Sequence, residues 1–165
     1  MTMLHTLLLA LAAANTSAYT PLDIARCRVI EEIDEGASTR FLCPGHAGVP
    51  LYINSGDGRF DLDAGVDNDE WESLYPFNHL GPRVEWRMRG RTPVAAIYRV
   101  IVDSPEGTVR SALVVESIGR PGRPGCLTAV INGALPNANR IARADADRAA
   151  AHRCGAQAPV WRGMP

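Results

Sequence analysis

Four cysteines constrain the fold of this chain more than any other feature. They are Cys27, Cys43, Cys126 and Cys154, and an even number of cysteines in an exported chain is typical of disulfides. Three pairings are possible, and we favour Cys27–Cys43 with Cys126–Cys154 because each bridge joins neighbours along the chain. A zinc site is the alternative, but the chain has no C-x-x-C pair to support it.

The evidence for export lies at the amino terminus. Residues 7–14 form an unbroken apolar run, which is shorter than the roughly 20 residues of a membrane-spanning helix. Such a run suits the apolar region of a signal peptide, and the small residues after it suit cleavage. We place the signal peptide at residues 1–18, with cleavage after Ala14 as the alternative to cleavage after Ala18. A buried helix is the structural alternative, which the absence of polar positions at helical spacing disfavours.

Composition excludes several classes of function. The formal net charge is -1, so there is no electrostatic case for binding nucleic acid or an anionic membrane surface. All 17 basic residues are arginine, which excludes a Schiff-base lysine, a phosphate-loop lysine and a serine–lysine dyad. No later segment is apolar enough to span a membrane, and no cofactor motif is present. We expect a periplasmic or secreted protein without a cofactor.

Short alternating segments separated by turn residues predict a β-rich domain over residues 19–158, followed by a flexible tail over 159–165. The predicted strands cover residues 27–33, 39–43, 51–54, 59–63, 84–89, 94–102, 109–118 and 126–131. One helix is expected over residues 136–154, with Asn137 as its cap and Gly155 at its end. The fold class is therefore α+β: an antiparallel sheet of about six to eight strands with a carboxyl-terminal helix on one face.

Acidic residues crowd into a short stretch that begins in the turn of the predicted second hairpin and continues past its second strand. Clustered carboxylates are the ligands that Ca²⁺ prefers, so these residues are candidate metal ligands. They are Asp57, Asp61, Asp63, Asp67 and Asp69, with Glu70 beside them. The spacing does not fit an EF-hand loop, because Val66 stands where that loop requires glycine. A solvated acidic surface is the alternative.

Charged residues inside the predicted central strands form a second candidate site. They are Glu85, Arg87, Arg99 and Glu116, of which Glu85, Arg99 and Glu116 can share one face if the strands pair in order. A structural ladder of ion pairs is the favoured interpretation. The functional alternative is a polar binding patch, because arginine can hold a carboxylate or phosphate with two parallel hydrogen bonds.

Catalytic patterns are weak. There is no His-x-x-x-His pair and no Gly-x-Ser-x-Gly elbow, and the cysteines are expected to be oxidised. A hydrolase or lyase would have to combine Glu85 or Asp57 with His46 or His79 in space.

An ordered series of short motifs resembles an uncharacterised family of small exported bacterial proteins. The series is Cys43-Pro44-Gly45, Asp57-Gly58-Arg59, Val84-Glu85-Trp86-Arg87 and the stretch Pro93–Arg99, then Cys126 and a helix with Asn139, Ala142 and Asp145 that closes at Cys154. The resemblance implies a periplasmic or secreted setting and assigns no catalytic residue.

These patterns favour a non-catalytic binding or interaction module of the cell envelope, of inhibitor or accessory type, with an envelope protein as a possible partner. The alternatives are a small envelope hydrolase or lyase, and a calcium-dependent binding domain.

Overall fold

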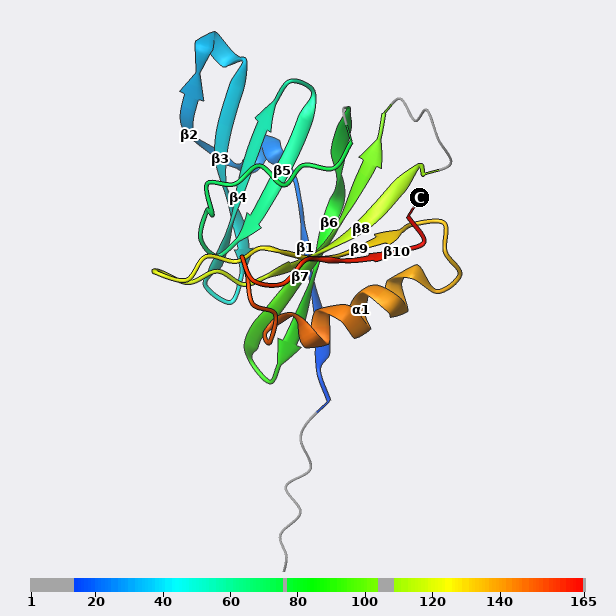
Figure 1. Cartoon of the computed structure of the whole chain (residues 1–165). Coiled ribbons are helices and arrows are strands. Elements are labelled where there is room, and N and C mark those ends of the chain that lie inside the picture. The colour runs from blue at the N-terminus through cyan, green and yellow to red at the C-terminus, as the bar shows by residue number, and fades with distance from the viewer. Residues whose placement is uncertain (1–13, 76, 104–108, 165) are drawn as a thin grey trace, which may run out of the picture.

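Ten strands and one α-helix form the fold in a computed structural model that describes residues 14–75, 77–103 and 109–164 (Figure 1). The strands are β1 (Thr16–Pro21), β2 (Arg28–Ile33), β3 (Ser38–His46), β4 (Val49–Gly56), β5 (Arg59–Ala64), β6 (Asn78–Arg89), β7 (Thr92–Val102), β8 (Ser111–Ser117), β9 (Leu127–Asn132) and β10 (Val160–Arg162), and the helix is α1 (Ala138–Ala149). Short 3-10 helices cover Ile24–Arg26 and Asp34–Gly36.

The strands divide into two sheets. The larger sheet has six strands in the order β1-β6-β7-β8-β9-β10, and the smaller has four in the order β2-β3-β4-β5. All neighbours are antiparallel except β9 and β10, which are parallel. The predicted α+β class is therefore confirmed, but with ten strands in two sheets rather than six to eight in one.

Both predicted disulfides are confirmed. Cys27 is bonded to Cys43 and Cys126 to Cys154, so no cysteine is free. The first bridge joins the open end of the β2–β3 hairpin, and the second joins the start of β9 to the segment after α1. Within the described residues, no helix is long and apolar enough to cross a membrane.

Two strands lie where the sequence analysis placed no structure. Thr16–Ala18, assigned to the signal peptide, pair with Met88, Arg87 and Trp86 of β6 as the first half of β1. Val160–Arg162, assigned to the flexible tail, pair with β9 as β10. Neither segment shows a strand pattern in the sequence. Each becomes a strand because the edge of the larger sheet offers unpaired backbone N–H and C=O groups to which it can bond. Residues 7–13 of the apolar run over residues 7–14 lie outside the described residues.

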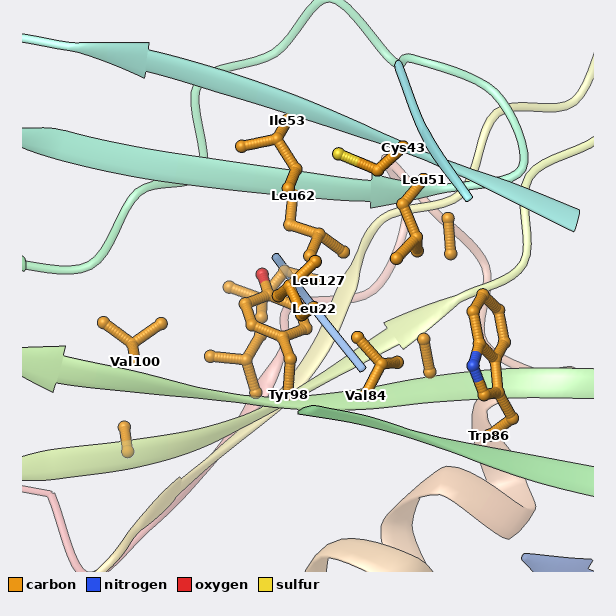
Figure 2. Close-up of a cluster of buried hydrophobic side chains, with 14 of the residues drawn as sticks. Leu22, Cys43, Leu51, Ile53, Leu62, Val84, Trp86, Tyr98, Val100 and Leu127 are labelled. Carbon is orange, nitrogen blue, oxygen red and sulfur yellow. The ribbon is translucent and has the colours of Figure 1, made fainter. Parts of the chain in front are cut away.

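The main core lies between the two sheets (Figure 2). Leu51, Ile53 and Leu62 of the smaller sheet face Tyr98 and Val84 of the larger one (Figure 2). Trp86 was expected to be a core residue, and its side chain is fully buried. Its indole N–H donates to Thr20 Oγ1 at 2.8 Å, which ties β6 to β1.

The helix covers the opposite face of the larger sheet. Ala138, Ala142, Ala146 and Ala149 are buried against apolar residues of β7, β8 and β9, as Figure 1 shows for the backbone. Because alanine is small, the helix packs close to the sheet. α1 is shorter than the predicted 136–154, since the chain turns after Ala149 to bring Cys154 to Cys126. Asn137 occupies the N-cap position without a capping side-chain hydrogen bond.

Candidate metal centre

Four acidic side chains meet where the edge strand of the smaller sheet comes against the larger sheet. Asp61 and Asp63 belong to β5, Glu116 belongs to β8, and Glu72 lies in the loop between β5 and β6. β5 is in contact with both β6 and β8, so acids that are distant in the sequence share one site. We call these four residues the carboxylate cluster.

Oxygen atoms of three members converge on one point. One carboxylate oxygen each of Asp63, Glu72 and Glu116 lies within 4.8 Å of the other two. Asp61 lies two residues before Asp63 on β5 and so on the same face of that strand. A single ion could therefore contact several of these oxygens at once.

The cluster is almost closed to solvent. Asp63 and Glu116 are each 1% exposed, and Asp61 is 3% exposed. One buried oxygen of each, Asp61 Oδ2, Asp63 Oδ1 and Glu116 Oε1, has no hydrogen-bond partner in the part of the chain that the structure describes. Buried polar atoms are nearly always hydrogen-bonded, since leaving one unpaired is costly. Three such oxygens in one place require a physical explanation.

The loop after β5 orients two of the carboxylates. The backbone N–H of Asn68 donates to Asp63 Oδ2 at 3.3 Å, and Asn68 Nδ2 donates to Glu72 Oε2 at 3.1 Å. The backbone N–H of Leu127 also donates to Glu72 Oε2, at 3.1 Å. These bonds hold one oxygen of each carboxylate, so the other oxygen is left to face the cluster.

Close backbone approach at Gly65 directs this loop toward β8. Gly65 has a φ of +96°, and a Cβ there would lie only 2.2 Å from the carbonyl oxygen of Gly119. The N–H of Gly119 donates to Ala64 O at 2.7 Å. Only glycine fits this position, because a side chain would separate β5 from the segment after β8.

Burial and mutual repulsion shift the pKa values of the cluster upward. Burial, with the charge of Glu72, raises the pKa of Asp61 to about 7. Burial, with the charge of Asp61, raises the pKa of Asp63 to about 8. Burial raises the pKa of Glu116 well above its ordinary value, and the charge of Glu72 adds to the shift. Each shift has the direction expected for a carboxylate that lacks a cationic partner.

No basic side chain of the described residues forms an ion pair with any member of the cluster. Arg40 is engaged by other groups: its Nε donates to Asn54 Oδ1 at 2.9 Å and lies 3.1 Å from Asp67 Oδ2. Arg40 also contacts Asp69 and Glu31. The negative charge of the cluster is therefore not neutralised by the protein.

The structure separates the predicted metal ligands into two groups. Asp61 and Asp63 belong to the cluster. Asp57 and Asp69 have side chains that are 88% and 79% exposed and form ion pairs with Arg59 and Arg40. Asp67 approaches the cluster, but its carboxylate contacts Arg40. Asp57 and Asp69 thus lie on the solvated acidic surface that was the alternative prediction.

The predicted charged patch is also divided. Glu85, Arg87 and Arg99 lie on the helix side of the larger sheet, whereas Glu116 lies on the side facing the smaller sheet. The register explains this, since Glu116 pairs with Ala96 while Glu85 pairs with Ile97. Neighbouring strand positions point to opposite faces, so the expectation that Glu116 shares a face with Glu85 is wrong.

The groups proposed for catalysis do not come together in the described structure. Glu85 forms an ion pair with Arg143, Asp57 with Arg59, and His79 contacts Asp103. His46 lies with its ring centroid 6.0 Å from that of Trp86. In the cluster itself, burial separates the carboxylates from any substrate in solution.

The donor set of the cluster is that of a hard-cation site. Carboxylate oxygens are the preferred ligands of Ca²⁺ and Mg²⁺, and no nitrogen or sulfur ligand is part of the set. Glu72 was missed in the sequence because it lies in an irregular loop, where no periodic pattern indicates which way a side chain points. No family model, curated protein or solved structure matches this chain.

Proposed function

We propose that this chain is an exported, disulfide-bonded binding domain that holds a divalent cation, Ca²⁺, in the carboxylate cluster. The observation that carries the proposal is the set of three buried, unpaired carboxylate oxygens at Asp61, Asp63 and Glu116. Burying several like charges without a counter-ion is strongly unfavourable. A bound cation removes that cost by supplying the missing charge and the missing contacts together.

Protonation is the competing way to neutralise the cluster. With pKa values of about 7 for Asp61 and about 8 for Asp63, protons alone neutralise these groups only in acidic to neutral solution. In alkaline solution the folded chain has to bury the charges or bind a cation. Cation binding must therefore displace protons and grow stronger as the pH rises.

Ca²⁺ suits the site better than Mg²⁺. Ca²⁺ accepts six to eight oxygens in flexible geometry, whereas Mg²⁺ demands octahedral geometry and keeps several waters. Asp63 and Glu116 are each 1% exposed, so an ion bound between them is coordinated by protein oxygens rather than by bulk water. Calcium sites of extracellular modules bind with Kd values of roughly 0.1–1 mM, a range that suits an exported domain.

Export rests on three observations. The first is the signal-peptide pattern at the amino terminus, and the second is the pair of disulfides, which persist in oxidising compartments. The third is the ordered series of short motifs, from which we expect a resemblance to small exported bacterial proteins. We propose a periplasmic or secreted location on these grounds.

Thermal unfolding at pH 8 tests the cation proposal. In Ca²⁺ at about 100 times Kd the folded state gains about 2.7 kcal/mol over the same protein in EDTA, which raises Tm by about 5–10 °C. Mg²⁺ at the same concentration should raise Tm less.

Variants separate the cluster from general surface charge. Glu116→Gln and Asp63→Asn keep the side-chain size and should abolish the Ca²⁺-dependent rise in Tm. Asp69→Asn removes an exposed acid from the loop that follows β5 and should retain the Ca²⁺-dependent rise in Tm. Equal Tm values in EDTA and in excess Ca²⁺ for the unaltered protein would exclude the proposal.

A second candidate function, interaction with an envelope protein, rests on β2. This edge strand projects from the body of the molecule with β3 (Figure 1), and Val29, Ile30 and Ile33 are 51%, 36% and 46% exposed. An exposed apolar edge strand can pair with a strand of another protein.

A photo-crosslinking residue at position 30 should capture one defined envelope protein in living cells, whereas the same residue at position 140 of α1 should not. Equal labelling from both positions would remove this candidate.

A further inference from the structure

We infer that an arginine-lined cleft on the helix side of the larger sheet binds a small, soluble organic anion through its carboxylate or phosphate groups. The cleft has a volume of about 340 Å³, within the range of small-molecule sites. Its polar lining comprises Arg83, Arg99, Arg143, Tyr19, Asn139 and Glu85. We call it the arginine cleft, and it is separate from the carboxylate cluster.

Three structural elements bring the arginines together. Arg83 comes from β6, Arg99 from β7, and Arg143 from the middle of α1. The β6–β7 pairing is interrupted between Leu80 and Val84, so Arg83 lies in a bulged segment beside Arg99. Bulges re-aim side chains and are common next to binding sites.

The arginines exceed the acids that could neutralise them. Arg143 pairs with Glu85, its Nε and Nη2 lying 2.5 and 3.3 Å from the two carboxylate oxygens. Arg99 donates to the hydroxyl of Ser111 at 2.8 Å, and the guanidinium of Arg83 lies 5.8 Å from the ring centroid of Tyr19. Neither Arg83 nor Arg99 has an acidic partner among residues 14–75, 77–103 and 109–164. The cleft therefore carries positive charge that a ligand can neutralise.

Glu85 acts as a positioning residue in this arrangement. Its carboxylate accepts hydrogen bonds from Ser17 Oγ and Arg143 Nε, each at 2.5 Å. Arg143 Nη2 in turn donates to the hydroxyl of Tyr19 at 3.1 Å. These bonds hold the Arg143 guanidinium at the cleft before any ligand arrives, which lowers the entropy cost of binding.

The lining indicates the class of ligand. Arginine binds carboxylates and phosphates with paired hydrogen bonds, and two unpaired arginines favour a ligand with about two negative charges. Ile97 and Leu113 supply an apolar wall, so an anion with a carbon skeleton fits better than an inorganic ion. A di- or tricarboxylate or a phosphate monoester meets these requirements.

Calorimetric titration with citrate and with glycerol 3-phosphate tests the inference. The protein and the buffers are first freed of divalent cations with a chelating resin, so the outcome is independent of cation binding and no dissolved polycarboxylate competes with the probes. We expect saturable binding of at least one probe, and Arg83→Gln and Arg99→Gln should each weaken it about tenfold or more. Arg140→Gln removes the same charge from an exposed position of α1 outside the cleft, and should change the affinity less than about twofold.

Three outcomes overturn the inference. They are failure of both probes to bind, equal weakening by Arg140→Gln, and binding that appears only with vesicles of phosphatidylglycerol. The last would show that a lipid surface, not a soluble anion, supplies the phosphate. Circular dichroism of each variant establishes that it is folded.

Discussion

On the helix side of the larger sheet, buried and half-buried acids are paired with arginines, whereas the buried acids on the side facing the smaller sheet are not. Asp145 accepts hydrogen bonds from Arg148 at 2.5 Å and from Arg162 Nε at 3.0 Å, and Asp147 accepts two from Arg87, at 2.8 and 3.0 Å. No member of the carboxylate cluster has such a partner in the described structure. The same residue type is thus stabilised on one face and left uncompensated on the other.

The pKa values follow this difference. Burial acts to raise the pKa of Asp145 and of Asp147, but hydrogen bonds from their arginine partners leave both pKa values below the ordinary value. In the cluster no arginine opposes the burial, the hydrogen bonds from neighbouring groups are too weak to offset it, and the pKa values of Asp61 and Asp63 rise to about 7 and about 8. Paired acids on the helix side are part of the scaffold, while the unpaired ones form the site at which we propose that a cation binds.

The largest expected effect is the pH dependence of stability in EDTA. Asp61 and Asp63 have folded pKa values near 7 and 8 against an ordinary value of 3.8, so between pH 4 and 8 the folded chain binds more protons than the unfolded chain. The free energy of unfolding therefore falls by several kcal/mol as the pH rises through this window. Excess Ca²⁺ should remove most of the fall. Urea unfolding from pH 5 to 9 measures this, and a flat profile in EDTA would contradict the shifted pKa values.

The contribution of the acids on the helix side to the free energy of unfolding should change with pH in the opposite direction. Because the folded pKa values of Asp145 and Asp147 are lowered, their contribution is present above the ordinary pKa and is lost as the solution becomes acidic. Asp147→Asn leaves Arg87, whose side chain is 9% exposed, without its acid. Because the Asp147 side chain is 37% exposed and solvent screens the pair, the loss should be about 2 kcal/mol at pH 7. Asp57→Asn, at an exposed position, should change stability by less than about 0.5 kcal/mol. A similar loss in both variants would show that pairing on the helix side is not what stabilises it.

The amino-terminal strand belongs to the paired face. Ser17 Oγ accepts from Arg87 Nη1 at 2.7 Å, and the carbonyl of Asn15 accepts from Arg87 Nη2 at 3.2 Å. A chain beginning at Tyr19 loses these bonds and should be less stable than one beginning at Asn15 by about 2 kcal/mol. We therefore expect cleavage after Ala14, with Asn15 as the first residue of the exported protein by mass spectrometry. A mature protein that begins at Tyr19 and is equally stable would contradict this expectation.

The smallest effect concerns a single member of the cluster. Asp63→Asn removes one unneutralised charge and should stabilise the protein in EDTA at pH 9 by about 1–2 kcal/mol, while reducing the slope of stability against pH. Asp69→Asn, in the loop that follows β5, is the matched control and should leave both quantities unchanged. Destabilisation by Asp63→Asn at pH 9 in EDTA would mean that the carboxylate is not an uncompensated charge.

Much of this architecture could be predicted from local sequence patterns. Alternation of apolar and charged residues over Val84–Arg89 predicts a strand whose Trp86 side chain lies in the core. The hairpins over residues 27–43 and 51–63 are predicted by turn residues between apolar runs. The disulfide pairing followed from chain proximity. These features depend on residues that are close in the sequence, so they can be predicted without knowledge of the tertiary fold.

The features that could not be predicted from the sequence depend on strand register and on contacts between residues far apart in the chain. The face of Glu116 could not be predicted because a shift of one residue in pairing moves a side chain to the other side of a sheet. Glu72 reaches the cluster only because Gly65 and Gly119 bring a loop against β8. β10 is too short to show a period and forms by adding to an existing edge.

Calcium titration by calorimetry at pH 7, in two buffers of different ionisation heat, tests the central claim most directly. We predict saturable binding of one Ca²⁺ with release of about one proton or more per ion, since the cluster is partly protonated at that pH. Binding without proton release would place the ion elsewhere, and no binding at all would show that protons alone neutralise the cluster.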